Sequence, residues 1–269
     1  MTGWPRERRV IGALAALLLS SVLATTRSSH ATEEATPSPQ SAEALSPPGI
    51  NPDLLLPRPD GRIVLLVTPD ADGHYSKAAV ERLALVAHEY GEMPAEIRYR
   101  GTEAFVDFKC DPLKGCTCPE APADPRATYV DVTFFSSKLE VYAWSRMHTF
   151  AGSCGVPRMY RIVVNLGLIN KDKMLGLTSA RLQARGLVHE YGHMLGLCGT
   201  LDHCYRVSDG RAGHCRRADC ALSGPTGKAK VYALFHTGFF GKNVDDYCTL
   251  CKKDIANAKA DWASMRAGP

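Results

Sequence analysis

The ten cysteines of this 269-residue chain all follow residue 109, and this uneven placement is the strongest constraint on its fold. Ten is more than a typical cytosolic enzyme carries, and too few for a small scaffold held together by disulfides alone. With 45% hydrophobic and 22% charged residues the chain can build an ordinary core, so wholesale disorder is excluded. We therefore expect a globular domain whose C-terminal half is cross-linked by disulfides, by metal or by both.

The N-terminal residues have the pattern of a secretory signal. Arginines precede a short apolar run, and small residues stand at the usual cleavage positions near residue 24. The run is shorter than the roughly 20 residues that a membrane span needs, which leaves a retained signal anchor as the alternative. We predict a signal peptide over residues 1–24, a secreted or periplasmic protein, and no stable membrane association after cleavage. Export to an oxidising compartment also favours disulfides.

The composition beyond residue 24 divides the chain into two parts. Residues 25–58 are rich in Ser, Pro, Ala and Glu and show no periodicity, which predicts a flexible linker or pro-segment. Residues 59–269 are then expected to form one domain. The formal net charge of +4 is only mildly basic, so we expect no nucleic-acid partner.

Hydrophobic patterning predicts a mixed α/β (α+β) domain with a twisted mixed sheet. Expected strands occupy residues 62–68, 96–99, 129–135 and 160–166, and expected helices occupy residues 76–90, 179–196 and 254–265. Two stretches rich in cysteine, 110–125 and 198–250, are expected to be irregular. The fold prediction is therefore a sheet with helices, followed by an irregular, cysteine-rich C-terminal subdomain.

The segment HEYGHMLG, residues 189–196, carries the chemistry and lies in the helix expected at 179–196. Four residues apart on a helix, His189 and His193 project from one face and can both bind one Zn²⁺ at about 2.0–2.1 Å. Glu190 lies beside that face, where it can remove and return a proton of a metal-bound water. Gly196 lets the helix end and the chain turn toward a third ligand. The segment predicts metal-assisted hydrolysis of an amide, with Glu190 as general base.

Two histidines downstream are candidates for the third metal ligand, His203 and His214. Four cysteines follow in two close pairs, Cys215 with Cys220 and Cys248 with Cys251. Each close pair can supply two sulfur ligands, and the fold can bring the two pairs together around one zinc ion. These four cysteines therefore have the spacing of a second zinc site.

This stretch resembles the archaemetzincin family of zinc metallopeptidases, whose signature joins HExxHxxGxxH directly to a Cys, followed by CxM and a later CxxC. The match covers roughly residues 186–253. The resemblance implies a metzincin-like zincin domain in which His189, His193 and His214 bind a catalytic zinc. It also implies a structural zinc whose ligands are Cys215, Cys220, Cys248 and Cys251.

The chain departs from the family pattern in three places. The family's third histidine would fall at Gly199, so an insertion precedes His214 and leaves His203 as its rival. Leu222 stands where the family has the Met of its Met-turn; that Met resembles an apolar floor under the metal, so leucine is a volume-conserving replacement. A second insertion must lengthen the spacing between Cys220 and Cys248.

Six cysteines remain, enough for three disulfides. We expect Cys198 to pair with Cys204 and so to staple the insertion after Gly196. The upstream cysteines, Cys110, Cys116, Cys118 and Cys154, are expected to tie the 110–125 loop to the region of Cys154. The alternative pairs all ten cysteines in five disulfides, without a second zinc.

The sequence thus predicts a monomeric zinc metallopeptidase, an endopeptidase or an aminopeptidase-like hydrolase, that acts on a peptide or protein substrate. The substrate backbone would lie along an edge strand, for which residues 160–166 are the candidate, and Tyr232 or Tyr247 could stabilise an oxyanion. The alternatives are a non-catalytic, zinc-stabilised binding module and a hydrolase of small amides. Glu190 favours an enzyme, because a purely structural metal site needs no carboxylate beside the metal.

Overall fold

The computed structural model describes residues 50–101, 110–111, 115–116, 124–136, 149–154, 156–171, 178–198, 203–205, 213–223 and 245–267. These residues all belong to one of two compact units of the chain, Leu45–Pro269, and the other unit is Met1–Ala44. The predicted signal peptide, most of the predicted linker, Cys118 and Tyr232 lie outside the described residues.

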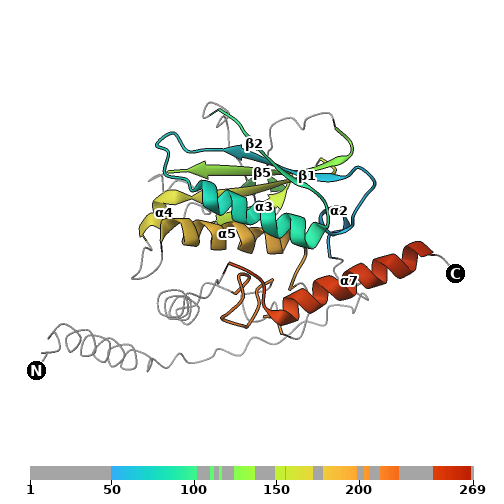
Figure 1. Ribbon diagram of the computed structural model, residues 1–269. Helices are drawn as coiled ribbons and strands as arrows, with labels where there is room; N and C mark the ends of the chain where they lie inside the picture. Colours follow the sequence, from blue (N-terminus) through green and yellow to red (C-terminus); the bar gives the residue numbers. More distant parts are fainter. Residues whose placement is uncertain are drawn as a thin grey trace, which may run out of the picture. The chain divides into compact units, whose positions relative to one another are not determined.

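The described domain contains a five-stranded sheet, seen with its helices beneath it in Figure 1. Its strands are β1 (Arg62–Thr68), β2 (Ala95–Tyr99), β5 (Ala127–Phe135), β6 (Thr149–Ser153) and β7 (Met159–Asn165). The spatial order is β2-β1-β5-β7-β6, with four parallel strands and β6 antiparallel to β7. The predicted mixed sheet is confirmed.

The strand expected at residues 160–166 is not an edge strand, so that part of the prediction was wrong. It forms β7, which pairs with β5 on one side and with β6 on the other. Both sides of its backbone are therefore engaged, and the edge of the sheet next to it is β6. The sequence of β6, TFAGS, is short and lacks the alternation that marks a strand, which is why sequence patterning missed it.

A second difference lies in the segment expected to be a loop at 110–125. Two short strands, β3 (Cys110–Asp111) and β4 (Gly115–Cys116), pair there as an antiparallel ribbon. Two-residue strands leave no periodicity in the sequence from which they could be predicted.

Helices α3 (Lys77–Gly91) and α5 (Ser179–Met194) pack side by side on one face of the sheet (Figure 1). Both begin at hydroxyl caps: the Ser76 side chain accepts from the Ala79 N–H, and Thr178 accepts from the Arg181 N–H. Alternate residues of β5 face these helices in the main core, namely Val130, Val132 and Phe134. The packing fixes α5, which contains the HEYGH segment, against the sheet.

The folded domain begins before the predicted boundary at residue 59. The short helix α2 (Pro52–Leu55) places Leu54 and Leu55 in the main core, where they are 0% and 2% exposed. Asn51 donates from its backbone N–H to the Leu195 carbonyl and from its side chain to the Met194 carbonyl. The end of the segment assigned to the linker is therefore part of the domain, although its proline-rich composition hides this.

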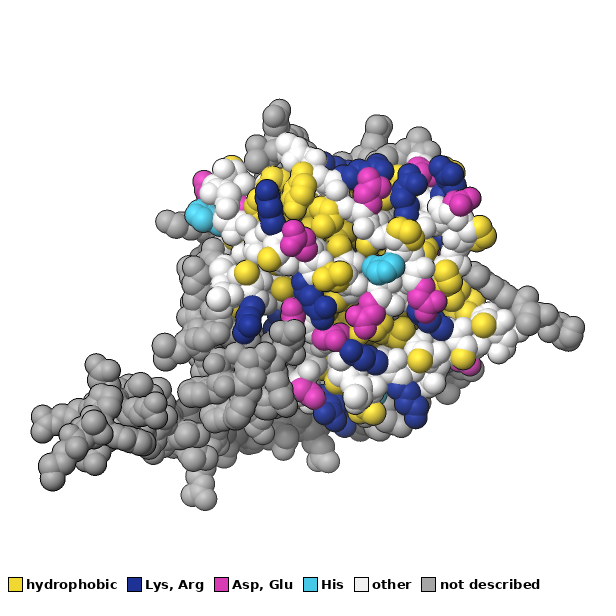
Figure 2. All heavy atoms as spheres, in the orientation of Figure 1, with side chains coloured by type: hydrophobic (Ala, Val, Ile, Leu, Met, Phe, Trp, Pro, Cys, Tyr) yellow, Lys and Arg dark blue, Asp and Glu magenta, His cyan; other side chains and the backbone are white. Residues whose placement is uncertain are grey.

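Two further helices complete the described part of the chain. α4 (Leu166–Lys171) follows β7 directly, and α7 (Thr249–Ala267) begins beside the last cysteine pair and includes the helix expected at 254–265. Within the ranges given above, no helix combines the length and the apolar character needed to cross a bilayer. On the face drawn in Figure 2, acidic and basic side chains are interspersed among apolar ones.

Candidate functional site

Three histidines converge at the C-terminal half of α5. His189 and His193 come from the helix itself, and His214 comes from the chain that follows Gly213. One ring nitrogen of each lies within 4.8 Å of the others, and the Nε2 atoms of His189 and His193 are 3.1 Å apart. Two nitrogens bound to one tetrahedral zinc at about 2.0–2.1 Å would be about 3.3 Å apart. The three side chains therefore fit one zinc ion.

A backbone carbonyl orients the first of these ligands. His189 Nδ1 lies 2.9 Å from the carbonyl oxygen of Ala221. Because a carbonyl only accepts hydrogen bonds, Nδ1 carries the proton, and Nε2 keeps its lone pair for a metal. This contact joins helix α5 to the segment that carries the second group of ligands. Ala221 acts through its backbone, so no residue-type signal in the sequence could have revealed this role.

Burial keeps the two helix histidines in the form that binds metal. Desolvation lowers the pKa of His189 to about 3, with a further lowering from the nearby His193 ring. Desolvation likewise lowers the pKa of His193 to about 4, assisted by His214. Zinc binds the neutral imidazole, so near neutral pH neither helix histidine has to lose a proton first.

Two glycines give the chain its path from the helix to the third ligand. Gly196, with φ 77°, follows the end of α5, and its N–H bonds to the His193 carbonyl. Gly213 has φ 80°, and a Cβ there would lie 3.5 Å from two atoms of the His193 ring. The backbone at Gly213 therefore lies close to the His193 ring, and its positive φ favours glycine at this position.

The structure separates the two candidates for the third ligand. His214 joins the histidine group, and its ring centroid lies 5.1 Å from that of His189 and 4.8 Å from that of His193. His203 lies instead beside the cysteines, with Nε2 3.5 Å from Cys251 Sγ. The geometry therefore favours His214 as the third ligand of the histidine site.

Glu190, the predicted general base, is a buried residue of helix α5. It follows His189 on α5, and its residue is only 5% exposed. A carboxylate in such a buried position is costly unless it has a partner or a role. Its catalytic role remains a prediction.

Leu222 and Tyr247 pack under α5 at Gly192. A Cβ on Gly192 would lie 2.9 Å from Leu222 Cδ1 and 3.0 Å from Tyr247 Cε1, so only glycine lets the helix approach this closely. Leu222 is fully buried, as expected of an apolar floor. The Tyr247 hydroxyl donates to the Val188 carbonyl at 2.8 Å. The prediction that Tyr247 serves an oxyanion was wrong, because its only proton is directed at the helix backbone.

The four cysteines of the predicted second site form one buried group, and none of them is in a disulfide. Cys215 Sγ lies 3.8 Å from Cys248 Sγ, and Cys220 Sγ lies 3.7 Å from Cys251 Sγ. Four sulfurs at about 2.3 Å from a tetrahedral zinc would be about 3.8 Å apart. The group fits a zinc ion, and the free thiols contradict the alternative of five disulfides.

Backbone donors support two of these sulfurs. The backbone N–H of Arg217 donates to Cys215 Sγ, and that of Cys248 donates to Cys220 Sγ. Both N···S distances are 3.4 Å. Such donors favour the thiolate, the form that a metal binds. The segment from Cys215 to Leu222 thus holds two candidate sulfur ligands, the carbonyl that orients His189, and the leucine that packs under the helix.

The predicted disulfide between Cys198 and Cys204 is present. Cys154 is also disulfide-bonded, in agreement with the expected use of the upstream cysteines. The disulfide therefore holds the start of the insertion after Gly196 close to the end of α5.

The fold and the two groups together define a mixed α/β domain with a candidate three-histidine metal site and a candidate four-cysteine metal site. No family model matches the chain, and no curated protein matches it. Among solved structures, the chain is similar to the archaemetzincin from Methanopyrus kandleri, with a TM-score of 0.42 and 18% sequence identity. The similarity covers 75% of this chain and 97% of that chain.

Proposed function

We propose that this chain is an exported zinc-dependent metallopeptidase. The observation that carries the proposal is the group of His189, His193 and His214, whose ligand nitrogens lie within 4.8 Å of one another on a helix that also bears Glu190. Three protein ligands leave one position of a tetrahedral ion for a substrate or water, whereas structural zinc sites use all four. Export is supported by the disulfides at Cys198–Cys204 and at Cys154.

The chemistry divides between the metal and the carboxylate. A zinc ion in the histidine site would supply Lewis-acid polarisation and activation of water near neutral pH. Glu190 accepts a proton from the attacking water and delivers it to the leaving amine. His189, fixed by the Ala221 carbonyl, keeps its metal-facing nitrogen unprotonated throughout.

The substrate is proposed to be an extended peptide lying along β6 (Thr149–Ser153). This strand is the edge of the sheet beside β7, and α5 packs against both strands. The outer edge of a terminal strand can pair with a peptide backbone through main-chain hydrogen bonds. A peptide there would run past the metal site without displacing any strand of the sheet.

The decisive experiment compares wild type with E190Q on a peptide library, with zinc content measured for both. We expect E190Q to keep its zinc and to lose about 10²-fold or more in kcat/KM, because the amide cannot accept the proton. E81Q, which changes an exposed glutamate of α3, is the matched control and should hydrolyse peptides at the wild-type rate.

Equal hydrolysis by wild type and E190Q would contradict the peptidase proposal. If wild type binds zinc but cleaves no peptide, the protein is instead the zinc-stabilised binding module or the hydrolase of small amides. A second library of small amides separates these two, because only the hydrolase would turn it over.

A further inference from the structure

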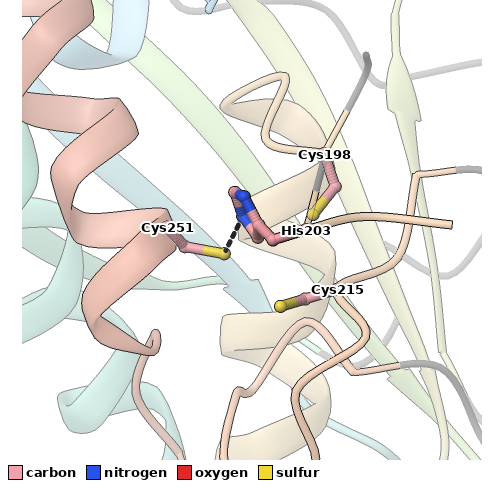
Figure 3. A group of neighbouring side chains, drawn as sticks. All are labelled: Cys198, His203, Cys215 and Cys251. Carbon is pink, nitrogen blue, oxygen red and sulfur yellow. Dashed lines mark hydrogen bonds between the residues drawn. The ribbon is translucent and has the colours of Figure 1, made fainter. Parts of the chain in front are cut away.

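A second set of potential metal ligands overlaps the four-cysteine group. It consists of Cys198, His203, Cys215 and Cys251, and one ligand atom of each lies within 4.8 Å of the others. Figure 3 shows the four side chains pointing toward a common region, from the end of α5, from the insertion, from the following loop and from α7. Two of its members, Cys215 and Cys251, also belong to the four-cysteine group.

The distance between His203 and Cys251 fits two ligands of one tetrahedral zinc ion. His203 Nε2 lies 3.5 Å from Cys251 Sγ. A nitrogen at about 2.0 Å and a sulfur at about 2.3 Å from a tetrahedral zinc would be about 3.5 Å apart. The three cysteines of the set are at most 2% exposed, so an ion among them would be shielded from water.

An independent feature of this region also favours a cation. Asp254 Oδ2 is buried and has no hydrogen-bond partner among the described residues, although it lies 3.3 Å from His203 Nε2. A metal on His203 would place positive charge next to this carboxylate.

In the oxidised protein Cys198 cannot serve as a ligand, because its sulfur is bonded to Cys204. Reduction by a dithiol removes this obstacle. The dithiol gives two electrons and two protons, the Cys198–Cys204 bond breaks into two thiols, and the reductant becomes a disulfide. The Cys198 thiol then loses its proton to the solvent as it binds a metal.

The structure assigns a redox-dependent zinc position to Cys198, His203, Cys215 and Cys251, closed by the Cys198–Cys204 disulfide and opened by its reduction. With both positions filled, the thiolates of Cys215 and Cys251 bridge two zinc ions. The four terminal ligands are then Cys220 and Cys248 on one ion and Cys198 and His203 on the other. The disulfide state thus sets whether this subdomain holds one ion or two.

The test is the zinc content per chain of wild type, C204S and the double variant C198S/C204S, each purified with zinc and free thiols counted. C204S leaves Cys198 as a thiol without any need for a reductant to reach a buried bond. We expect one zinc more in C204S than in either of the others. The double variant is the matched control. Like C204S it lacks the Cys198–Cys204 disulfide, but it has no thiol at position 198 to bind a metal.

Equal zinc content in C204S and C198S/C204S would overturn the proposal, and so would equal content in wild type and C204S. In the C204S background, H203N should remove the extra ion, and its retention would equally contradict the assigned ligand set. Thermal unfolding provides a second readout: zinc should raise the Tm of C204S more than that of the double variant. None of these comparisons depends on peptidase activity, because the histidine site is the same in every variant.

Discussion

At the residue scale, the site depends on contacts of single atoms that residue types do not reveal. HEYGH, the third histidine candidates and the four cysteines could all be predicted from spacing. Spacing alone left both His203 and His214 open, and the resemblance favoured His214; the structure places His214 with the two helix histidines and His203 beside Cys251. The carbonyl of Ala221, which orients His189, has no signature in the sequence at all.

Tyr247 gives a residue-scale prediction that separates structure from catalysis. Y247F removes the hydrogen bond to the Val188 carbonyl and should lower the free energy of unfolding by about 1 kcal/mol. Because that hydroxyl serves the helix backbone, kcat should stay within about twofold of wild type, whereas loss of an oxyanion donor costs about 10²-fold or more. Urea unfolding and peptide hydrolysis measure the two effects. A hundredfold fall in kcat with unchanged stability would reverse the assignment.

Gly192 gives a second prediction at this scale. In G192A the new methyl group would press on Leu222 and on the Tyr247 ring, at 2.9 and 3.0 Å. We expect the helix to be forced outward, with a loss of about 1–3 kcal/mol in the free energy of unfolding. Adding L222A should recover part of this loss, because it removes the nearer contact. A variant G192A as stable as wild type in urea would show that α5 does not pack as described.

At the element scale, helix α5 and the segment 213–223 form one unit. The sequence predicted the helix well, since its apolar face and the glycine that follows its end, Gly196, are local signals. It did not predict β6 or α2, because both are short and their burial depends on partners distant in sequence. The two metal groups meet in this unit, where His214 and Cys215 are adjacent and Ala221 bonds to His189.

The unit predicts that the cysteine site supports the histidine site. C248S should lose the cysteine-bound zinc and also weaken zinc binding at the histidines by about 10-fold or more, because the orienting segment loosens. Zinc titration followed by competition with a chelator measures both sites. The variant C154S is the control for loss of a cysteine as such, since it breaks a disulfide but removes no member of either metal group. Unchanged affinity at the histidine site in C248S would show that the two sites are independent.

At the scale of the whole molecule, the limits of the domain are the testable feature. A chain that begins at residue 50 keeps Asn51 and the buried Leu54 and Leu55, whereas one that begins at residue 59 loses all three. We expect the shorter chain to lose at least about 4 kcal/mol, since each deleted leucine leaves a cavity in the core. The longer chain should unfold like wild type in urea. Equal stability of the two truncations would place the boundary at residue 59 after all.

Anomalous diffraction at the zinc edge, on crystals of the oxidised protein grown without added metal, tests the central claim most directly. We predict two zinc peaks per chain, one bound by His189, His193 and His214 and the other by Cys215, Cys220, Cys248 and Cys251. A structure with no ion among the three histidines, or with His203 in place of His214, would contradict the site on which the proposed function rests.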